Sequence, residues 1–238
     1  MELISIKHIS KSFDGTSVLK NLSLTIDEKD IVLLEGENGA GKSTLFNMIT
    51  QMVQIDNGEM KYKGESIQGL SPLSISRKGI IRLHQDPRVF KNLNVVENLF
   101  CAIYYEKDIS FFNQIFRPKK TKQLEIDINE KAKSILKNFK LEHLAEHLAG
   151  SLSYGQQKLI AFTMIAMTEA ELILLDEPFA GLNPKMIDKL VEIIKHLNQE
   201  GKTFVIIEHN IKKAKEICSK HIVLENGVAV NKNMESLC

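Results

Sequence analysis

The sequence predicts an α/β fold, in which a core of alternating strands and helices carries an N-terminal antiparallel β subdomain and an inserted helical subdomain. Three observations support this prediction. Segments 3–13 and 18–26 alternate apolar and polar residues on either side of a turn signal. Short apolar runs later recur before segments with helical spacing, as at 172–175. Between them, residues 95–148 keep helical spacing almost throughout.

Length and composition fit one ordinary globular domain. The chain has 238 residues, of which 43% are hydrophobic and 26% charged, and this balance excludes disordered, collagen-like and disulfide-scaffold classes. The formal net charge is +1, so charge gives no reason to expect nucleic acid as a partner. Aromatic residues make up 6% and Trp is absent, which argues against base-stacking surfaces.

Cysteine usage and hydropathy bear on the compartment. Cys101, Cys218 and Cys238 are far apart and have no metal-ligand spacing, which favours a reducing, cytosolic setting. No apolar run approaches the roughly 20 residues that span a bilayer, and the N-terminus lacks a signal-peptide core. We therefore expect that any membrane-spanning part is supplied by another chain.

The N-terminal third is expected to consist mainly of strands. Asp14-Gly15 is a hairpin-type turn signal between the first two of them. A short apolar run ends at Gly36, and a helical pattern begins near Lys42. The expected strands are 3–13, 18–26, 31–35, 58–63 and 80–83.

The middle of the chain is expected to be a helical subdomain over residues 86–152, inserted into an α/β core made of 1–85 and 153–238. After the insertion, strands and helices alternate again. The expected elements are a helix from Gly155, a strand over 172–175, a helix over 184–197, a strand over 203–207, a helix from Asn210 and a hairpin around 225–227.

A glycine-rich loop stands between an expected strand and an expected helix. It reads Gly36-Glu37-Asn38-Gly39-Ala40-Gly41-Lys42-Ser43, which matches the phosphate-loop pattern in full. Such glycines let successive backbone N–H groups face an anion at a helix N-terminus. Lys42 would reach the β- and γ-phosphates and Ser43 would hold Mg²⁺. The alternative, a glycine-rich turn with an incidental Lys-Ser, does not explain the strand and helix on either side.

The apolar strand over 172–175 runs directly into Asp176-Glu177. Carboxylates at the end of a buried strand are costly unless a cation or polar cleft receives them. We expect Asp176 to hold Mg²⁺, through water, and Glu177 to act as the general base on the attacking water. The alternative is a solvated strand end followed by a turn at Pro178.

A further motif gives these residues a family context. Leu152-Ser153-Tyr154-Gly155-Gln156 resembles the Leu-Ser-Gly-Gly-Gln signature of the nucleotide-binding subunits of ATP-binding cassette (ABC) transporters, and it lies about twenty residues before the acidic strand end. Five short motifs follow the family's order over essentially the whole chain. The resemblance implies a P-loop NTPase core of the ABC ATPase type.

The resemblance also implies roles for individual residues. It makes Glu177, His209 and Gln85 catalytic, and Ser43, Gln85 and Asp176 ligands of Mg²⁺. The implied ATP contacts are Phe13, Gly36, Glu37, Asn38, Gly39, Ala40, Gly41, Lys42, Ser43, Thr44, Ser153, Gly155 and Gln156. Taken singly, an aromatic such as Phe13 is more often core, and a lone Gln or His is more often solvated or structural. Their joint order and spacing favour the functional interpretation.

The implied protein is an ATP-binding and ATP-hydrolysing subunit of an ABC transporter, with ATP and Mg²⁺ as cofactors. Implied partners are a second ABC ATPase subunit of the same or another sequence, transmembrane permease subunits and a solute-binding protein, on the cytoplasmic face of the membrane. The string Asp176 to Pro184 and the Tyr of the signature resemble importers of the branched-chain amino-acid type, which implies import of amino acids or similar small solutes. Export of lipid or lipopolysaccharide, and a soluble ABC ATPase without a transport role, are the alternatives.

Two positions depart from the family pattern. Met164 stands where an Arg usually follows the signature, and Asn183 stands where Asp is commoner. The first bears on helix packing, and neither removes a residue needed for hydrolysis. A P-loop kinase or GTPase is disfavoured because it has no place for the signature motif or for His209.

Overall fold

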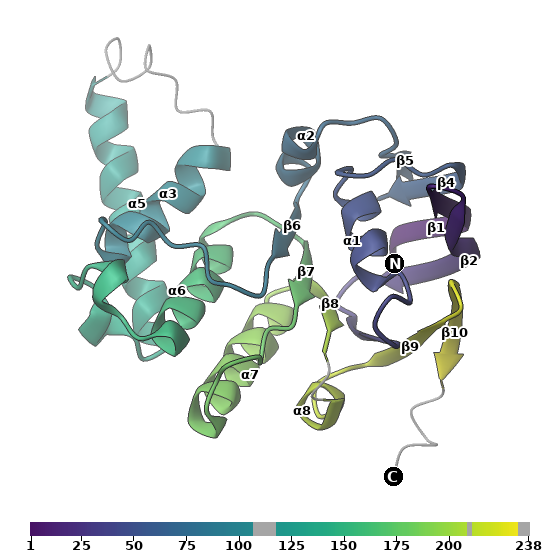
Figure 1. Cartoon of the computed structure of the whole chain (residues 1–238). Coiled ribbons are helices and arrows are strands. Elements are labelled where there is room, and N and C mark those ends of the chain that lie inside the picture. Colours follow the sequence, from purple (N-terminus) through teal and green to yellow (C-terminus); the bar gives the residue numbers. More distant parts are fainter. Residues whose placement is uncertain (107–117, 209–210, 233–238) are drawn as a thin grey trace. The chain divides into compact units, whose positions relative to one another are not determined.

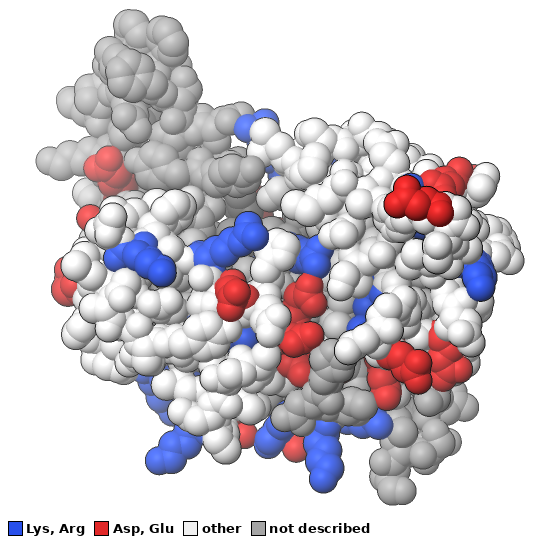
Figure 2. All heavy atoms as spheres, viewed as in Figure 1, with Lys and Arg blue, Asp and Glu red and all other residues white. Residues whose placement is uncertain are grey.

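The computed structural model describes residues 1–106, 118–208 and 211–232 (Figure 1). The chain divides into two compact units. The first contains Met1–Gln85, Ala170–Ala180 and Ile194–Cys238, and the second contains Asp86–Glu169 and Gly181–Ile193. On the face shown in Figure 2, residues of both charge signs are interspersed, which agrees with a net charge of +1.

The first unit begins with an antiparallel sheet whose strand order is β2-β1-β4-β5. Its strands are β1 (Glu2–Phe13), β2 (Thr16–Asp27), β4 (Asn57–Tyr62) and β5 (Glu65–Ser66). Asp14 and Gly15 join β1 to β2 with φ angles of 47° and 79°. Two consecutive residues with positive φ make the tight turn that suits a hairpin, as Asp-Gly predicted.

The same unit holds a six-stranded sheet of order β10-β9-β3-β8-β7-β6, parallel except for the edge strand β10. Its strands are β3 (Ile31–Glu35), β6 (Ile80–Leu83), β7 (Leu172–Asp176), β8 (Thr203–Ile207), β9 (Lys220–Glu225) and β10 (Val228–Lys232). β3, β7 and β8 read as continuous apolar runs because nearly all of their residues are buried. Parallel strands bring their carboxyl ends to one edge of the sheet, where β3 and β7 both end.

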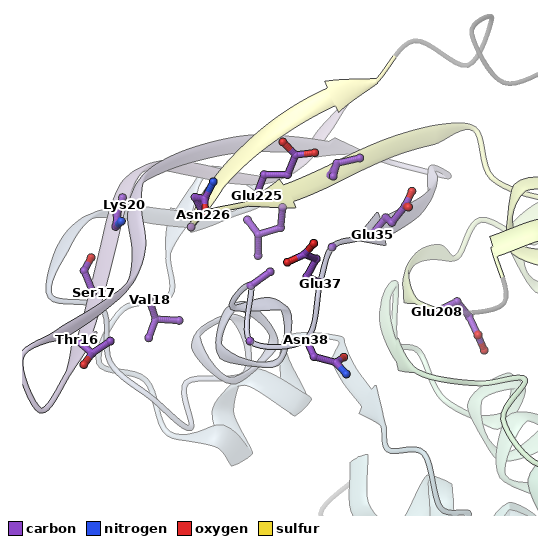
Figure 3. A pocket seen from close by; sticks show the side chains of 16 residues that line it. Thr16, Ser17, Val18, Lys20, Glu35, Glu37, Asn38, Glu208, Glu225 and Asn226 are labelled. Atoms are coloured by element: carbon purple, nitrogen blue, oxygen red, sulfur yellow. The ribbon is translucent and has the colours of Figure 1, made fainter.

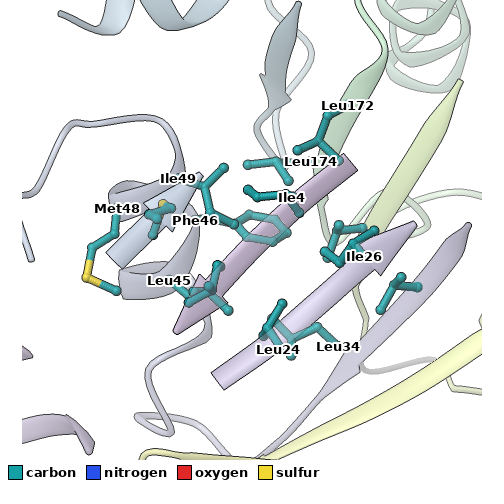
Figure 4. Packing of buried hydrophobic residues seen from close by; sticks show 14 of the residues in the cluster. Ile4, Leu24, Ile26, Leu34, Leu45, Phe46, Met48, Ile49, Leu172 and Leu174 are labelled. Atoms are coloured by element: carbon teal, nitrogen blue, oxygen red, sulfur yellow. The ribbon is translucent and has the colours of Figure 1, made fainter. Parts of the chain in front are cut away.

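One hydrophobic core joins the two sheets of the first unit through α1 (Lys42–Ile49). Leu45, Phe46 and Ile49 of this helix pack with buried residues of β1, β2, β3 and β7 (Figure 4). Phe46 is fully buried. The helix that follows the glycine-rich loop is therefore fixed by its apolar face, while its N-terminus remains at the sheet edge. Two short helices, α2 (Pro72–Arg77) and α8 (Ile211–Lys215), complete the unit.

The second unit is helical. It contains α3 (Val95–Glu106), α5 (Pro118–Asn138), α6 (Tyr154–Met167) and two short 3₁₀ turns, η1 (Glu142–Leu144) and η2 (Ala149–Ser151). α3, α5 and α6 contact one another, and Lys131 of α5 donates to the carbonyl of Met167 at 3.0 Å. Asn98 is fully buried, and its amide holds the loop before α3 through the carbonyls of Phe90, Leu93 and Asn94. α7 (Pro184–Gln199) has residues in both units.

The structure confirms the α/β class and most of the predicted elements. β3, β6 and β8 have the expected bounds, and β7 extends one residue further, to Asp176. The division into 1–85 with 153–238 and 86–152 stays a prediction, since the compact units follow spatial clustering and also assign 153–169 and 181–193 to the second unit. β5, α2 and the two 3₁₀ turns were not predicted. Within the described residues no helix is long and apolar enough to cross a membrane.

Candidate functional site

The glycine-rich loop connects β3 to α1, as predicted. Gly39 and Gly41 have φ angles of 84° and 99°, which an L side chain adopts only with strain. Gly41 immediately precedes α1, and its carbonyl accepts the first helical hydrogen bond, from Leu45 N–H at 2.8 Å. The N-terminus of a helix fixed in the core is thereby placed at the open edge of the sheet, where its partial positive charge favours an anion.

Lys42 turns back over the same loop. Its ammonium donates to the carbonyls of Gly36 at 2.7 Å and Glu37 at 2.9 Å, and the residue is 8% exposed. Burial lowers the pKa of the Lys42 ammonium, while the carboxylates of Glu177 and Asp176 act in the opposite direction. The phosphate loop and the acidic strand end, 134 residues apart in sequence between Lys42 and Asp176, therefore lie within electrostatic reach of each other.

Asp176 closes β7 and is held by an arginine. Arg82, on the neighbouring strand β6, donates from Nη2 to Asp176 Oδ2 at 2.6 Å and from Nη1 to Asn47 Oδ1 at 2.6 Å. Asn47 belongs to α1, so one guanidinium connects the helix after the phosphate loop with the acidic strand end. Within the described residues, Asp176 Oδ1 accepts no hydrogen bond.

Glu177 follows with a left-handed backbone, at φ 46°. Its N–H donates to the carbonyl of Ile207 at 2.9 Å, which ties this residue to the end of β8. Glu208 comes next on that chain segment, is 5% exposed, and accepts a hydrogen bond of 2.6 Å from Phe179 N–H. A non-glycine residue in this conformation is strained, and such strain is concentrated at functional sites.

The donor set suits Mg²⁺ bound with a phosphate ligand. Ser43 is exposed at the start of α1 and offers a hydroxyl, while Asp176 offers a carboxylate oxygen. In the described part of the chain, no group of three His, Cys, Asp or Glu side chains could hold a metal by itself. Mg²⁺ commonly takes one or two protein oxygens and completes its shell with water and substrate phosphate, so these residues fit it.

A pocket of about 740 Å³ opens beside the phosphate loop (Figure 3). Its volume is in the range of small-molecule sites. Residues 36–40 form one wall, the start of β2 forms another, and the β9–β10 hairpin forms the third. The residues that line it are Thr16, Ser17, Val18, Lys20, Glu35, Gly36, Glu37, Asn38, Gly39, Ala40, Glu208, Val223, Leu224, Glu225, Asn226 and Gly227.

The described part of the first unit contains three other predicted site residues, Phe13, Gln85 and Thr44. Phe13 ends β1, is 42% exposed and lies under the Lys11 ammonium, 5.2 Å from the ring centroid. It is outside the lining of the pocket. Gln85 is exposed just after β6, and Thr44 is half-buried in the first turn of α1. His209 lies outside the described residues.

The signature segment belongs to the second unit, at the start of α6. Ser153 is the N-cap of the helix: its hydroxyl accepts from Gln156 N–H at 3.4 Å, and Gln156 Oε1 accepts from Ser153 N–H at 2.9 Å. This reciprocal capping box satisfies two backbone donors that a helix start leaves unpaired. Ser153 and Gln156 thus have a local structural role, and their contact with a nucleotide stays a prediction.

Tyr154 and Gly155 pack against the loop that precedes α7 and against the first turn of that helix. A Cβ on Gly155 would stand 3.3 Å from Met186 Cγ, and one on Gly181 would stand 3.1 Å from the Tyr154 ring. The Tyr154 hydroxyl lies 3.3 Å from Asp86 Oδ1. Burial, together with the Asp86 charge, raises the pKa of Tyr154.

The two departures from the family pattern differ in what the structure explains. Asn183 Oδ1 accepts from Met186 N–H at 3.1 Å and so caps the start of α7, a role that Asp would fill equally well. Met164 is half-buried on α6, and nothing in the structure explains its presence there.

Sequence reasoning missed three residues that support the site, Arg82, Glu208 and His221. Arg82 holds the acidic strand end, and Glu208 holds the segment that follows it. His221 of β9 is 1% exposed and lies 2.6 Å from Glu35, the residue before the phosphate loop. The two residues of each contact are tens of residues or more apart in sequence, so no local pattern predicts the contact. Arg82 and His221 are polar residues inside otherwise apolar strands, which is a signal that each needs a partner, whereas Glu208 follows β8 and gives no such signal.

The family model for ABC transporters matches residues 19–180, which is more than half of the chain, so the chain belongs to the ABC transporter family. It is similar to the high-affinity branched-chain amino acid transport ATP-binding protein BraF of Pseudomonas aeruginosa, with 36% identity over 94% of this chain and 88% of that protein. It is also 30% identical to the lipopolysaccharide export system ATP-binding protein LptB of Haemophilus influenzae, over 95% of this chain and 88% of that one.

Among solved structures, the ADP conformation of MJ1267, an ATP-binding cassette of an ABC transporter, is similar with a TM-score of 0.82 and 31% identity, over 99% of this chain and 92% of that one. This confirms the ABC ATPase fold. The protein is the ATP-binding subunit of an ABC transporter and an ATP hydrolase.

Proposed function

We propose that this chain powers the movement of a solute through a separate membrane permease, by closing with a second ABC ATPase subunit around ATP. The observation that supports this most directly is the cluster formed by the phosphate loop, Lys42 and the acidic pair Asp176-Glu177 in the first unit. The signature segment belongs to the other compact unit. A head-to-tail dimer would let the signature of one subunit complete the site of the other.

Each residue of the cluster has a role in this proposal. Backbone N–H groups of the loop and the Lys42 ammonium hold the phosphates. Mg²⁺, when bound to Ser43, Asp176 and Gln85, would offset the charge of the triphosphate. Glu177 accepts the proton of the attacking water, and His209 orients that water toward the γ-phosphate. Ser153 and Gly155 of the partner subunit add donors at a helix N-terminus on closure.

The permease is proposed to contact an apolar patch on the second unit. Phe90 and Leu148 are each 54% exposed, so two large apolar side chains on neighbouring segments face solvent. Their segments run together through hydrogen bonds from Ala149 N–H to the Leu93 carbonyl and from Gly150 N–H to the Lys91 carbonyl, both 2.9 Å. This contact would place the chain at the cytoplasmic face of a membrane.

Import of amino acids or similar small solutes is the proposed transport reaction, because BraF and this chain share 36% identity over most of both sequences. A solute-binding protein would then deliver the cargo to the permease. Export of a lipid or lipopolysaccharide is the second candidate, favoured by the similarity to LptB.

Co-purification tests the transport role. The tagged chain is isolated from its native membranes in mild detergent, and its partners are identified by mass spectrometry. A multi-spanning permease is expected, and a solute-binding protein among the partners would favour import. Recovery of no membrane protein would contradict a transport role and leave only ATP hydrolysis. Phe90→Glu, which keeps a side chain of similar length but adds charge, should abolish the permease contact without lowering ATP binding.

A further inference from the structure

Arg82 makes the tightest set of contacts at the acidic strand end. Its guanidinium reaches Asp176 Oδ2 and Asn47 Oδ1, each at 2.6 Å, and lies 5.4 Å from the centroid of the Phe46 ring. Only 9% of the Arg82 side chain is exposed, against 20% for Asp176. Three elements, β6, β7 and α1, therefore meet at one side chain.

Arg82 and Asp176 are both largely buried, so neither charge is stable there without its partner. A desolvated carboxylate without a counter-charge is strongly unfavourable, and so is a desolvated guanidinium. Arg82 Nε is itself buried and donates to no acceptor within the described residues. The two terminal nitrogens of the guanidinium donate to Asn47 and Asp176, and these two hydrogen bonds fix its orientation.

We propose that Arg82 is a positioning residue that acts as the counter-charge of Asp176 in the metal-free protein, and that it weakens the binding of Mg²⁺ at this carboxylate. The inference rests on the proposed function, because it takes Asp176 as a ligand of Mg²⁺. It goes beyond that function by naming a residue that sets the metal affinity.

The effect of Arg82 on the metal is electrostatic. A divalent cation that approaches Asp176 must share a carboxylate already paired with a fixed positive charge, and the two cations repel each other. Removing the positive charge of Arg82 therefore favours Mg²⁺ at Asp176. We expect an effect of about tenfold, at the weak end of the range for charges a few ångströms apart, because Ser43 and phosphate oxygens share the metal.

The contact also constrains the geometry. Because Oδ2 accepts from Arg82, Oδ1 is the more accessible carboxylate oxygen for a further ligand. Asn47 fixes the guanidinium from the other side, and Asn47 belongs to the helix that begins at the phosphate loop. Arg82 therefore sets both the charge and the orientation that Asp176 presents.

Calorimetry can measure this effect without hydrolysis. The full chain is loaded with a non-hydrolysable ATP analogue in the absence of divalent metal, and Mg²⁺ is titrated into it. Arg82→Met removes the charge and keeps much of the volume, and Arg82→Lys keeps the charge but not the fork. Lys63→Met is the matched control, because it deletes a 2.6 Å ion pair with Glu171 whose side chains are 43% and 46% exposed.

The expected result is that Arg82→Met binds Mg²⁺ about tenfold more tightly than the wild type. Arg82→Lys should stay within about threefold, since its ammonium keeps the opposing charge. Lys63→Met should leave the affinity unchanged. Unchanged or weaker Mg²⁺ binding by Arg82→Met would overturn the inference, since a purely structural arginine would lower stability without tightening the metal.

Two further measurements keep the inference testable. If Arg82→Met fails to fold, the wild type is labelled with ¹⁵N-arginine, of which the chain has four, and the Arg82 signal is assigned with Arg82→Lys. Mg²⁺ should shift that signal in the analogue-loaded protein, and an unmoved signal would refute the inference. Asp176→Asn separates the two proposals: if it leaves Mg²⁺ affinity unchanged, the metal assignment itself fails, whereas weaker binding with no effect of Arg82→Met defeats this inference alone.

Discussion

Gly41→Ala is the substitution whose cost the structure determines most directly. Gly41 precedes α1 with φ 99°, and an added Cβ would stand 2.7 Å from Leu19 Cδ2 and 3.2 Å from Val18 Cγ1. Leu19 is fully buried, so it cannot turn aside into solvent. The backbone strain and the collision act together at the N-terminus of the helix.

The two effects have separate magnitudes. A left-handed backbone costs an L residue about 1–2 kcal/mol, and an extra methyl in a packed core costs about 1–3 kcal/mol. Gly41→Ala should therefore lower the free energy of unfolding by roughly 2–5 kcal/mol. Gly64→Ala is the matched control, because Gly64 has φ 78° and an added Cβ meets nothing within 4 Å. It should cost only the backbone share, about 1–2 kcal/mol.

Urea unfolding followed by circular dichroism gives both values, and ATP binding to each folded variant gives the functional consequence. Gly41→Ala should weaken ATP binding because the helix N-terminus must shift, whereas Gly64→Ala should not. Equal losses of stability in the two variants would refute the packing argument. Unchanged ATP affinity in Gly41→Ala would refute the assignment of this helix N-terminus as the phosphate site.

Three further results are expected. Glu177→Gln should retain ATP binding and slow hydrolysis by about 10²–10⁴-fold, measured as phosphate release, and rapid turnover would exclude Glu177 as the base. Tyr154→Phe should lower the free energy of unfolding by about 0.5–1.5 kcal/mol, measured by urea unfolding, because the contact with Asp86 is lost. Tyr154→Leu is the comparison, and it should cost more because it also removes the ring that packs on Gly181. Burial raises the pKa of Cys218 to about 12, so the folded thiol should resist alkylation at pH 8, and folding stability should fall between pH 9 and 12 as the unfolded thiolate forms but the native one does not. Fast labelling of native Cys218, or stability independent of pH in that interval, would contradict its burial.

The fold could be predicted in large part because its signals are local. The apolar runs of β3, β7 and β8 are continuous, since parallel strands are buried on both faces. The turns at Asp14-Gly15 and Asn226-Gly227 can be recognised in the sequence, because two consecutive positive φ angles favour these residue types. α2 was missed because it is six residues long and buries a single side chain, Ile75, which leaves no period to detect.

Some residues of the candidate site could likewise be predicted from local sequence signals, and others could not. The phosphate loop and the acidic strand end are contiguous motifs, so the sequence shows them directly. The residues that support them are not contiguous: Arg82 lies 94 residues from Asp176, and Glu208 lies 29 residues from Phe179, whose N–H donates a hydrogen bond to it. Such pairs depend on which strands become neighbours in the sheet. A charged residue in an apolar strand marks a position that needs a partner, but only the topology identifies that partner.

The signature segment requires a test that separates structure from function, because Ser153 both caps α6 and is proposed to contact the γ-phosphate of the partner subunit's ATP. Ser153→Ala would confuse the two by removing the cap. Ser153→Asp keeps it, since Asp caps helices about as well as Ser, so stability should stay within about 0.5 kcal/mol of the wild type. The added carboxylate would face a triphosphate, however, and repulsion should abolish ATP-driven closure of the dimer, measured by light scattering in the Glu177→Gln background. A Ser153→Asp variant that closes around ATP as readily as its parent would show that the N-terminus of α6 does not meet phosphate, and the signature would then be a capping motif alone.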